Sequence, residues 1–279
     1  MDMLISSIKT QYKMIVEKKN YYLMFLTIFI YVLINFFTNV FKYASRDVTE
    51  MYHPMRLLLL ANTGYYFYFF MLLYPIIVII PASFSYIYDQ DINEQIFIQS
   101  RTGIKNYYFG KLIATFLSTF NIFTIPFLAE IILNSIAFPN NATGLLSNMS
   151  IYESTELESI HRLLLPNLYI RSIYLYVILL TIIWGIVSGV IATYALTISI
   201  IIKFKYKTFL FLPIYILSYV LYEVQYILPQ IDKTTYYFFY FDIFDTSRKS
   251  LMGYILCILM MTASSILLAM YKSGQDSLL

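Results

Sequence analysis

The sequence has few charged residues and few of the side chains on which redox and hydrolytic chemistry depend. Only 13% of its 279 residues are charged, whereas soluble domains carry ~25%. It contains one cysteine, Cys257, and two histidines, His53 and His161. A single cysteine excludes an intrachain disulfide. We therefore expect neither a water-soluble fold nor a redox site.

Motifs of enzymes and of nucleic-acid-binding proteins are missing as well. The sequence has neither H-E-x-x-H nor G-x-S-x-G, and we find no other set of a nucleophile or metal with a positioned base. The net charge of +3 is small, and no basic cluster with interleaved aromatic residues lies outside the apolar stretches. We expect a chain that is not an enzyme, holds no metal and binds no nucleic acid.

Apolar residues make up 59% of the chain and gather into blocks. A block of about 20 residues is long enough for a helix to cross the hydrocarbon layer of a membrane. The first block is too long for a signal-peptide core, so we expect it to be a span. The blocks predict a single all-α transmembrane domain over residues 1–279, with about six transmembrane helices at 21–41, 65–86, 107–137, 172–202, 208–228 and 251–271.

The distribution of lysine and arginine predicts the orientation of these spans. Eleven such residues fall on the side of the termini and eight on the other side, where the loops are longer. Three of the eleven lie in the short loop Lys203–Lys207. Cytoplasmic loops are enriched in basic residues. We therefore expect a multi-pass protein of the cell membrane with both termini in the cytoplasm.

The first 20 residues predict an amphipathic helix at the membrane surface. Within residues 3–19, one helical face would carry Leu4, Ile5, Ile8, Tyr12 and Ile15, with Ser7 and Lys9 on other faces. Such a helix suits the membrane interface and leads into the first span. A basic tail without helical structure is the alternative.

The segment from Asp89 to Leu112 predicts a second short helix, on the cytoplasmic side. Asp91 followed by Glu94 fits a capping box, and Gly103 suits the end of a helix. Ile92 and Ile96 would share a face. A small helix with an apolar face and several charges is suited to docking on a partner protein.

This segment resembles a known family. Arg101-Thr-Gly103 and Tyr107-Tyr-Phe-Gly-Lys-Leu112, together with six spans and cytoplasmic termini, resemble the permease subunit of ATP-binding-cassette exporters of the type-2 class. The resemblance implies that 91–101 is the coupling helix that fits a groove in an ATPase. The residues implied in coupling are Asp91, Glu94, Ile96, Arg101 and Lys105. It also implies a dimer of permeases, formed with a second copy or a paralogue.

The chain itself does not carry the ATPase. A phosphate-binding loop needs G-x-x-x-x-G-K-[ST]. Here Gly103 stands seven residues before Gly110, and Leu112 takes the place of the required hydroxyl residue. We expect this chain to bind no cofactor. The resemblance implies that ATP and Mg²⁺ are held by a dimer of separate ATPase subunits.

Small and polar residues inside the blocks predict packing and path positions. Thr181, Gly185, Gly189 and Thr193 recur every four residues, which lets another helix approach closely, either within the chain or from a second copy. Glu130 lies in the third block with Asn121 and Asn134. Because a charge inside the membrane is costly, these three could line a water-filled translocation path, or Glu130 could lie near the interface. Asn35 and Asn39 could form hydrogen bonds between helices.

Several functions fit this sequence. The leading hypothesis is a permease subunit that moves an amphipathic or hydrophobic cargo outward, such as a bacteriocin-like peptide or a lipid. A polysaccharide or lipid-linked glycan exporter subunit is an alternative of the same architecture. An immunity or assembly protein that transports nothing is an alternative of another class. The aromatic segment 229–250 could be re-entrant or interfacial.

Overall fold

The computed structural model describes residues 2–48, 51, 53–61, 64–140, 163–202, 206–227, 241–244 and 251–276. In these residues every regular element is a helix, so the all-α prediction is confirmed. The helices are α1 (Asp2–Val16), α2 (Lys19–Tyr43), α3 (Tyr65–Ile77), α4 (Ser85–Asp91), α5 (Glu94–Thr102), α6 (Ile104–Ala137), α9 (Pro166–Arg171), α10 (Ile173–Ile201), α11 (Leu212–Ile227) and α12 (Leu251–Asp276), with short 3₁₀ turns at η2 (Pro54–Arg56) and η3 (Lys207–Phe211).

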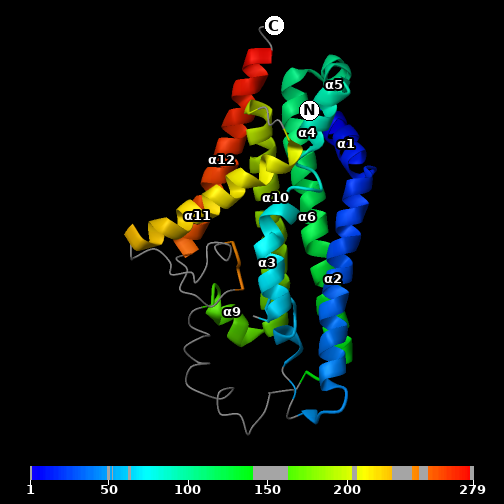
Figure 1. Ribbon diagram of the computed structural model, residues 1–279, viewed down its shortest axis with the longest axis vertical. Helices are drawn as coiled ribbons and strands as arrows, with labels where there is room; N and C mark the ends of the chain where they lie inside the picture. The colour runs from blue at the N-terminus through cyan, green and yellow to red at the C-terminus, as the bar shows by residue number, and fades with distance from the viewer. Residues whose placement is uncertain are drawn as a thin grey trace.

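Four of these helices, α2, α6, α10 and α12, are long and apolar enough to cross a membrane. Two shorter apolar helices, α3 and the stretch Phe209–Val224, occupy the second and fifth predicted spans. The architecture is therefore that of an all-α membrane protein. In Figure 1 the long helices run along the longest axis of the molecule, and α11 is strongly tilted against them.

The second predicted span, 65–86, is not one continuous helix. The helix α3 ends at Ile77, and the chain continues through turns before α4 begins at Ser85. Pro81 accounts for this end, because a proline ring clashes with the carbonyl four residues earlier, here that of Ile77. The hydroxyl of Ser83 donates to the carbonyl of Ala192 on α10 at 2.9 Å, which secures the irregular stretch inside the bundle.

The helix α10 forms the centre of the bundle, and its glycines lie against α6. A Cβ on Gly185 would come within 1.9 Å of Thr124 Oγ1, and one on Gly189 within 2.7 Å of the Phe116 ring. The small-residue stripe thus packs within the chain. On its other side α10 meets α3, where Trp184 lies 4.6 Å from the ring of Tyr74.

Both ends of the described chain lie at one end of the bundle, which we call the termini end (Figure 1). The backbone carbonyl of Asn106 accepts a hydrogen bond from Ser7 of α1, and Tyr108 bonds Asp276 at the end of α12. α6 has 34 residues and is about 51 Å long at ~1.5 Å per residue. It is therefore long enough to project beyond the membrane, and its first turns are where the termini meet.

Parts of the sequence predictions fall on residues that the structure does not describe. Residues 203–205 of the lysine-rich loop, His161, and most of the segment 229–250 lie outside the described residues. The four residues 241–244 of that segment are described, and Phe241 and Ile243 are buried in the core.

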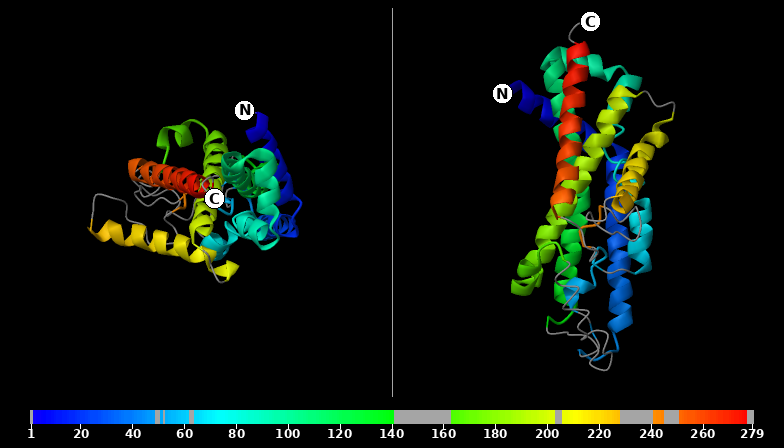
Figure 2. Two further views of the ribbon diagram at one scale, coloured as in Figure 1. Left: turned by 90° about the horizontal axis from the view of Figure 1, so that it is seen from above. Right: turned by 90° about the vertical axis from the view of Figure 1, so that its left-hand side faces the viewer.

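Seen from above, α11 points away from the bundle on the side opposite α1 and α2 (Figure 2).

Candidate functional site

The helix α5 projects at the termini end, between α4 and α6. Its inner side buries Ile98 and Thr102 against the bundle. Its outer side exposes Ile96 and Phe97, at 65% and 67% of their full surface, and Ile92 just before it is exposed at 63%. Large apolar side chains that face outward on a short helix are typical of a surface that meets another molecule.

The start of α5 differs from the predicted capping box. Asp91 is the last residue of α4, and Asn93, with φ 55° and ψ 19°, precedes Glu94 and makes no side-chain cap. Asparagine tolerates this left-handed conformation better than most residues, and it lets the chain turn between two helices within two residues. The predicted end is confirmed, because Gly103 has φ 83°.

The predicted coupling residues lie on α5 or next to its ends. Asp91, Ile96, Arg101 and Lys105 are exposed, and Glu94 is partly buried. α5 therefore offers two adjacent apolar side chains with basic groups at its C-terminal side. The resemblance implied Ile96, Arg101 and Lys105 in coupling, whereas Phe97 was not among the predicted residues, and the coupling role stays a prediction.

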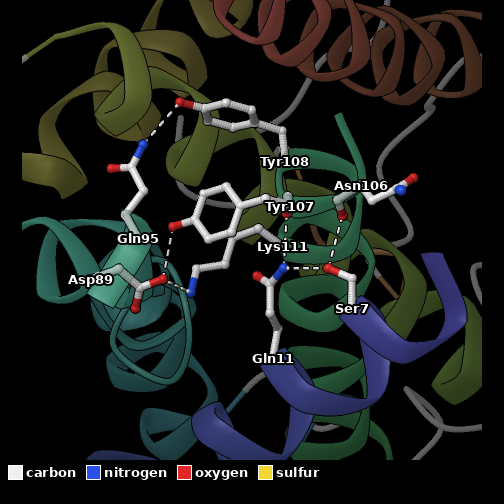
Figure 3. A network of polar contacts seen from close by, with 8 residues as sticks. All are labelled: Ser7, Gln11, Asp89, Gln95, Asn106, Tyr107, Tyr108 and Lys111. Carbon is white, nitrogen blue, oxygen red and sulfur yellow. Dashed lines mark hydrogen bonds and ion pairs between the residues drawn. The ribbon is translucent and has the colours of Figure 1, made fainter. Parts of the chain in front are cut away.

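A buried ion pair below α5 was not predicted. Lys111 on α6 lies 2.5 Å from the carboxylate of Asp89 on α4, and their side chains are 1% and 0% exposed. The hydroxyl of Tyr107 donates to the same carboxylate oxygen at 2.8 Å. Figure 3 shows the three side chains converging between α4 and α6. Lys111 is one of the eleven basic residues that the sequence analysis assigned to the side of the termini, but its side chain is buried inside the protein.

The N-terminal helix docks on the same turns of α6. Gln11 donates to Ser7 and to the carbonyl of Tyr107, each at 2.9 Å, and Ser7 donates to the carbonyl of Asn106 at 2.9 Å (Figure 3). A Cβ on Gly110 would come within 2.4 Å of Ser7 Oγ. Ser7 and Gln11 therefore face α6 and not the solvent.

Tyr108 connects α5 to the last helix. Its hydroxyl accepts from Gln95 of α5 at 3.3 Å and donates to Asp276 of α12. Asp276 also pairs with Lys272 at 3.0 Å. Through Tyr107, Tyr108 and Lys111, the start of α6 holds α1, α4, α5 and α12 together. A displacement of α5 would have to move or break these contacts.

The sequence contained a weak signal for this network. A lysine inside an apolar block requires a partner, and acidic residues stand some 20 positions earlier in the chain. The choice of Asp89 over Asp91 could not be made, because it depends on which side of α4 faces α6.

Asn121, Glu130 and Asn134, the residues proposed for a translocation path, differ from one another in their polar contacts. Asn121 donates to the hydroxyl of Tyr12 at 2.8 Å, so it anchors α1. Glu130 is buried and accepts from Asn35 at 2.7 Å and from the backbone N–H of Leu59 at 2.9 Å. Asn134 is fully buried, and neither of its amide atoms has a hydrogen-bond partner in the described structure. A path through these residues stays a prediction.

Glu130 fixes a short irregular segment that enters the bundle. Residues 57–60 are all buried, and the carbonyl of Leu57 accepts from Asn35 at 3.0 Å and from Asn39 at 2.9 Å. Irregular backbone at membrane depth requires such partners from the protein. The two asparagines therefore bond to this segment, and Asn35 also links α2 to α6 through Glu130.

No known protein family, curated protein or solved structure matches this chain in the comparisons made.

Proposed function

We propose that this chain is the membrane subunit of an ATP-driven exporter of the ATP-binding-cassette type, and that α5 receives a separate ATPase. The observation that carries the proposal is the outward-facing surface of Ile92, Ile96 and Phe97 at the termini end. The cargo would be amphipathic or hydrophobic, such as a peptide or a lipid.

The energetics of this surface favour a protein partner. Burying an exposed isoleucine or phenylalanine side chain contributes about 1.5–3 kcal/mol. Docking of Ile96 and Phe97 alone would thus provide a useful part of the free energy of association. Arg101 and Lys105 are exposed beside them, so the partner groove would carry carboxylates at that side, which speeds association and sets the orientation.

The contacts that join α4 and α5 to α6 would transmit a movement of α5 to the long helix α6. The ion pair Asp89–Lys111 and the bond from Gln95 to Tyr108 join α4 and α5 to the first turns of α6. Because breaking a buried ion pair costs about 3–5 kcal/mol, a force on α5 would move these helices together before it separates them. α6 then carries the displacement along the bundle.

The proposal places the termini end in the cytoplasm, where ATP is available. It also requires an assembly of two membrane subunits and two ATPase subunits around the cargo path. The membrane subunit alone would bind cargo but would not hydrolyse ATP, because the nucleotide and its Mg²⁺ would be held by the partner ATPase.

Co-purification tests the docking step. The tagged chain is co-expressed with each ABC-type ATPase of its source genome, starting with any encoded beside it. We expect one ATPase to co-purify, and Phe97→Ser and Ile96→Ser together to reduce its recovery at least tenfold. Phe41→Ser is the matched control, because Phe41 is 77% exposed at the far end of α2.

Two results would refute the proposal. One is full recovery of the ATPase with the double variant. The other is a chain that co-purifies with no ATPase of the genome. A chain that binds an ATPase yet moves no cargo in vesicles would instead support the alternative of a non-transporting scaffold.

A further inference from the structure

The outer side of α1 forms a groove with α6. Ile5, Ile8, Lys9 and Tyr12 of α1 line it together with Leu117 and Asn121 of α6, and its volume is about 280 Å³. The four α1 residues have the spacing i, i+3, i+4 and i+7, so they form one side of the helix. Lys9, which was expected on another face than Ile5, Ile8 and Tyr12, therefore shares their side. This side is distinct from the side of Ser7 and Gln11 that docks on α6.

The lining of the groove is apolar with a single charge. Ile5 and Leu117 expose 54% and 38% of their surface, and Lys9 is exposed. Lys9 is the one charged residue among the lining residues of the groove as the structure describes them. A ligand that fills this groove would therefore combine an apolar body with a negative charge.

The position of the groove favours a membrane lipid as the ligand. Leu117 and Asn121 belong to α6, a helix long and apolar enough to cross the membrane, so the floor of the groove faces hydrocarbon. Lys9 stands between Ser7 and Gln11, which bond to the first turn of α6 at the termini end. A lysine near a membrane surface attracts anionic lipid by about 1 kcal/mol.

We propose that the groove between α1 and α6 is a binding site for one anionic phospholipid. An acyl chain lies against Ile5, Ile8 and Leu117, and the headgroup phosphate contacts the ammonium group of Lys9. The site does not depend on an ATPase partner. It gives α1 a second attachment, to the bilayer, besides its hydrogen bonds to α6.

Lipid competition tests this site. The purified, delipidated chain is mixed with phosphatidylglycerol or phosphatidylcholine of matched chains, and retained lipid is measured by native mass spectrometry. We expect phosphatidylglycerol to be preferred. Lys9→Gln should reduce that preference about fivefold, which corresponds to about 1 kcal/mol, while Lys9→Arg keeps it. Leu117→Trp, which fills the groove, should reduce retention of both lipids.

Lys13→Gln is the matched control, because Lys13 is exposed one turn farther along α1, is not among the lining residues of the groove, and pairs with Glu17 at 3.6 Å. Its lipid preference should equal that of the unchanged protein. Emission from Trp184, the only tryptophan of the chain, verifies that the lysine variants are folded. Far-UV circular dichroism verifies the fold of Leu117→Trp, which contains a second tryptophan.

Four lipid-binding results would overturn the site. They are equal retention of the two lipids, an unchanged preference in Lys9→Gln, an equal loss in Lys13→Gln, and displacement of the lipid by soluble glycerol phosphate. The last result would identify a site for free phosphate instead of a lipid. A groove that is closed by a second copy of the chain would appear as a dimer that Leu117→Trp disrupts, without lipid release.

Discussion

Removing one partner of the buried pair Asp89–Lys111 should destabilise the protein strongly. At 2.5 Å and an effective dielectric constant of ~20, the attraction is about 6–7 kcal/mol. Desolvation of both ions opposes it, so truncating one partner costs about 3–5 kcal/mol, mainly because the other charge stays buried. We expect this loss for Lys111→Met and for Asp89→Asn separately.

The double variant Asp89→Asn with Lys111→Met should lose far less than the sum of the single variants. It buries no charge, and the asparagine can still accept from the hydroxyl of Tyr107, which donates to Asp89 at 2.8 Å. The remaining loss is that of one hydrogen bond, about 0.5–1.5 kcal/mol. Contacting residues show such non-additivity.

Unfolding in mixed micelles measures these changes. The emission of Trp184 reports the transition, because its side chain is fully buried beside Tyr74. Lys105→Met is the control, since Lys105 is exposed on the first turn of α6 and should change stability by about 0.5 kcal/mol or less. The reasoning fails if Lys111→Met loses less than Lys105→Met, or if the single losses simply add.

Three further predictions concern packing, the buried carboxylate and pH. Gly185→Ala should destabilise by about 1–3 kcal/mol through overpacking, whereas Gly274→Ala, with nothing within 4 Å of its Cβ, should be neutral in the same unfolding assay. Glu130→Ala leaves two donors unpaired and should cost about 1–3 kcal/mol for each; a loss below 1 kcal/mol would contradict its role. Burial, and then the neighbouring Arg56, lower the pKa of His53, whose Nδ1 accepts from a backbone N–H. Stability should therefore be complete above pH 6.5 and decrease as the pH falls below it, and a pH profile unchanged by His53→Asn would refute this.

The long spans could be predicted because hydrophobic length alone decides them. The expected span 172–202 and the observed helix Ile173–Ile201 differ by one residue at each end. Gly185 and Gly189 could be assigned to packing from their spacing, but only the fold shows that α6 is the neighbour. The break after Ile77 was missed, because Pro75 stands inside α3 without ending it and the sequence alone does not show that Pro81 does.

The polar contacts of the termini end could be predicted only in part. The exposed side of α5 follows from the local pattern, and so does its end at Gly103. The partner of Lys111 and the docking of Ser7 and Gln11 depend on how α1, α4 and α6 pack, which no local pattern contains. The same holds for Glu130, whose partners lie 71 and 95 positions away.

Photo-crosslinking from position 97 tests the central claim most directly. A photoreactive phenylalanine analogue replaces Phe97 in cells of the source organism, and Phe41, at the far end of α2, is replaced in parallel. We predict a crosslinked product from position 97 that contains a P-loop ATPase, and none from position 41. Crosslinks from position 97 only to lipid or to a second copy of this chain would contradict the account.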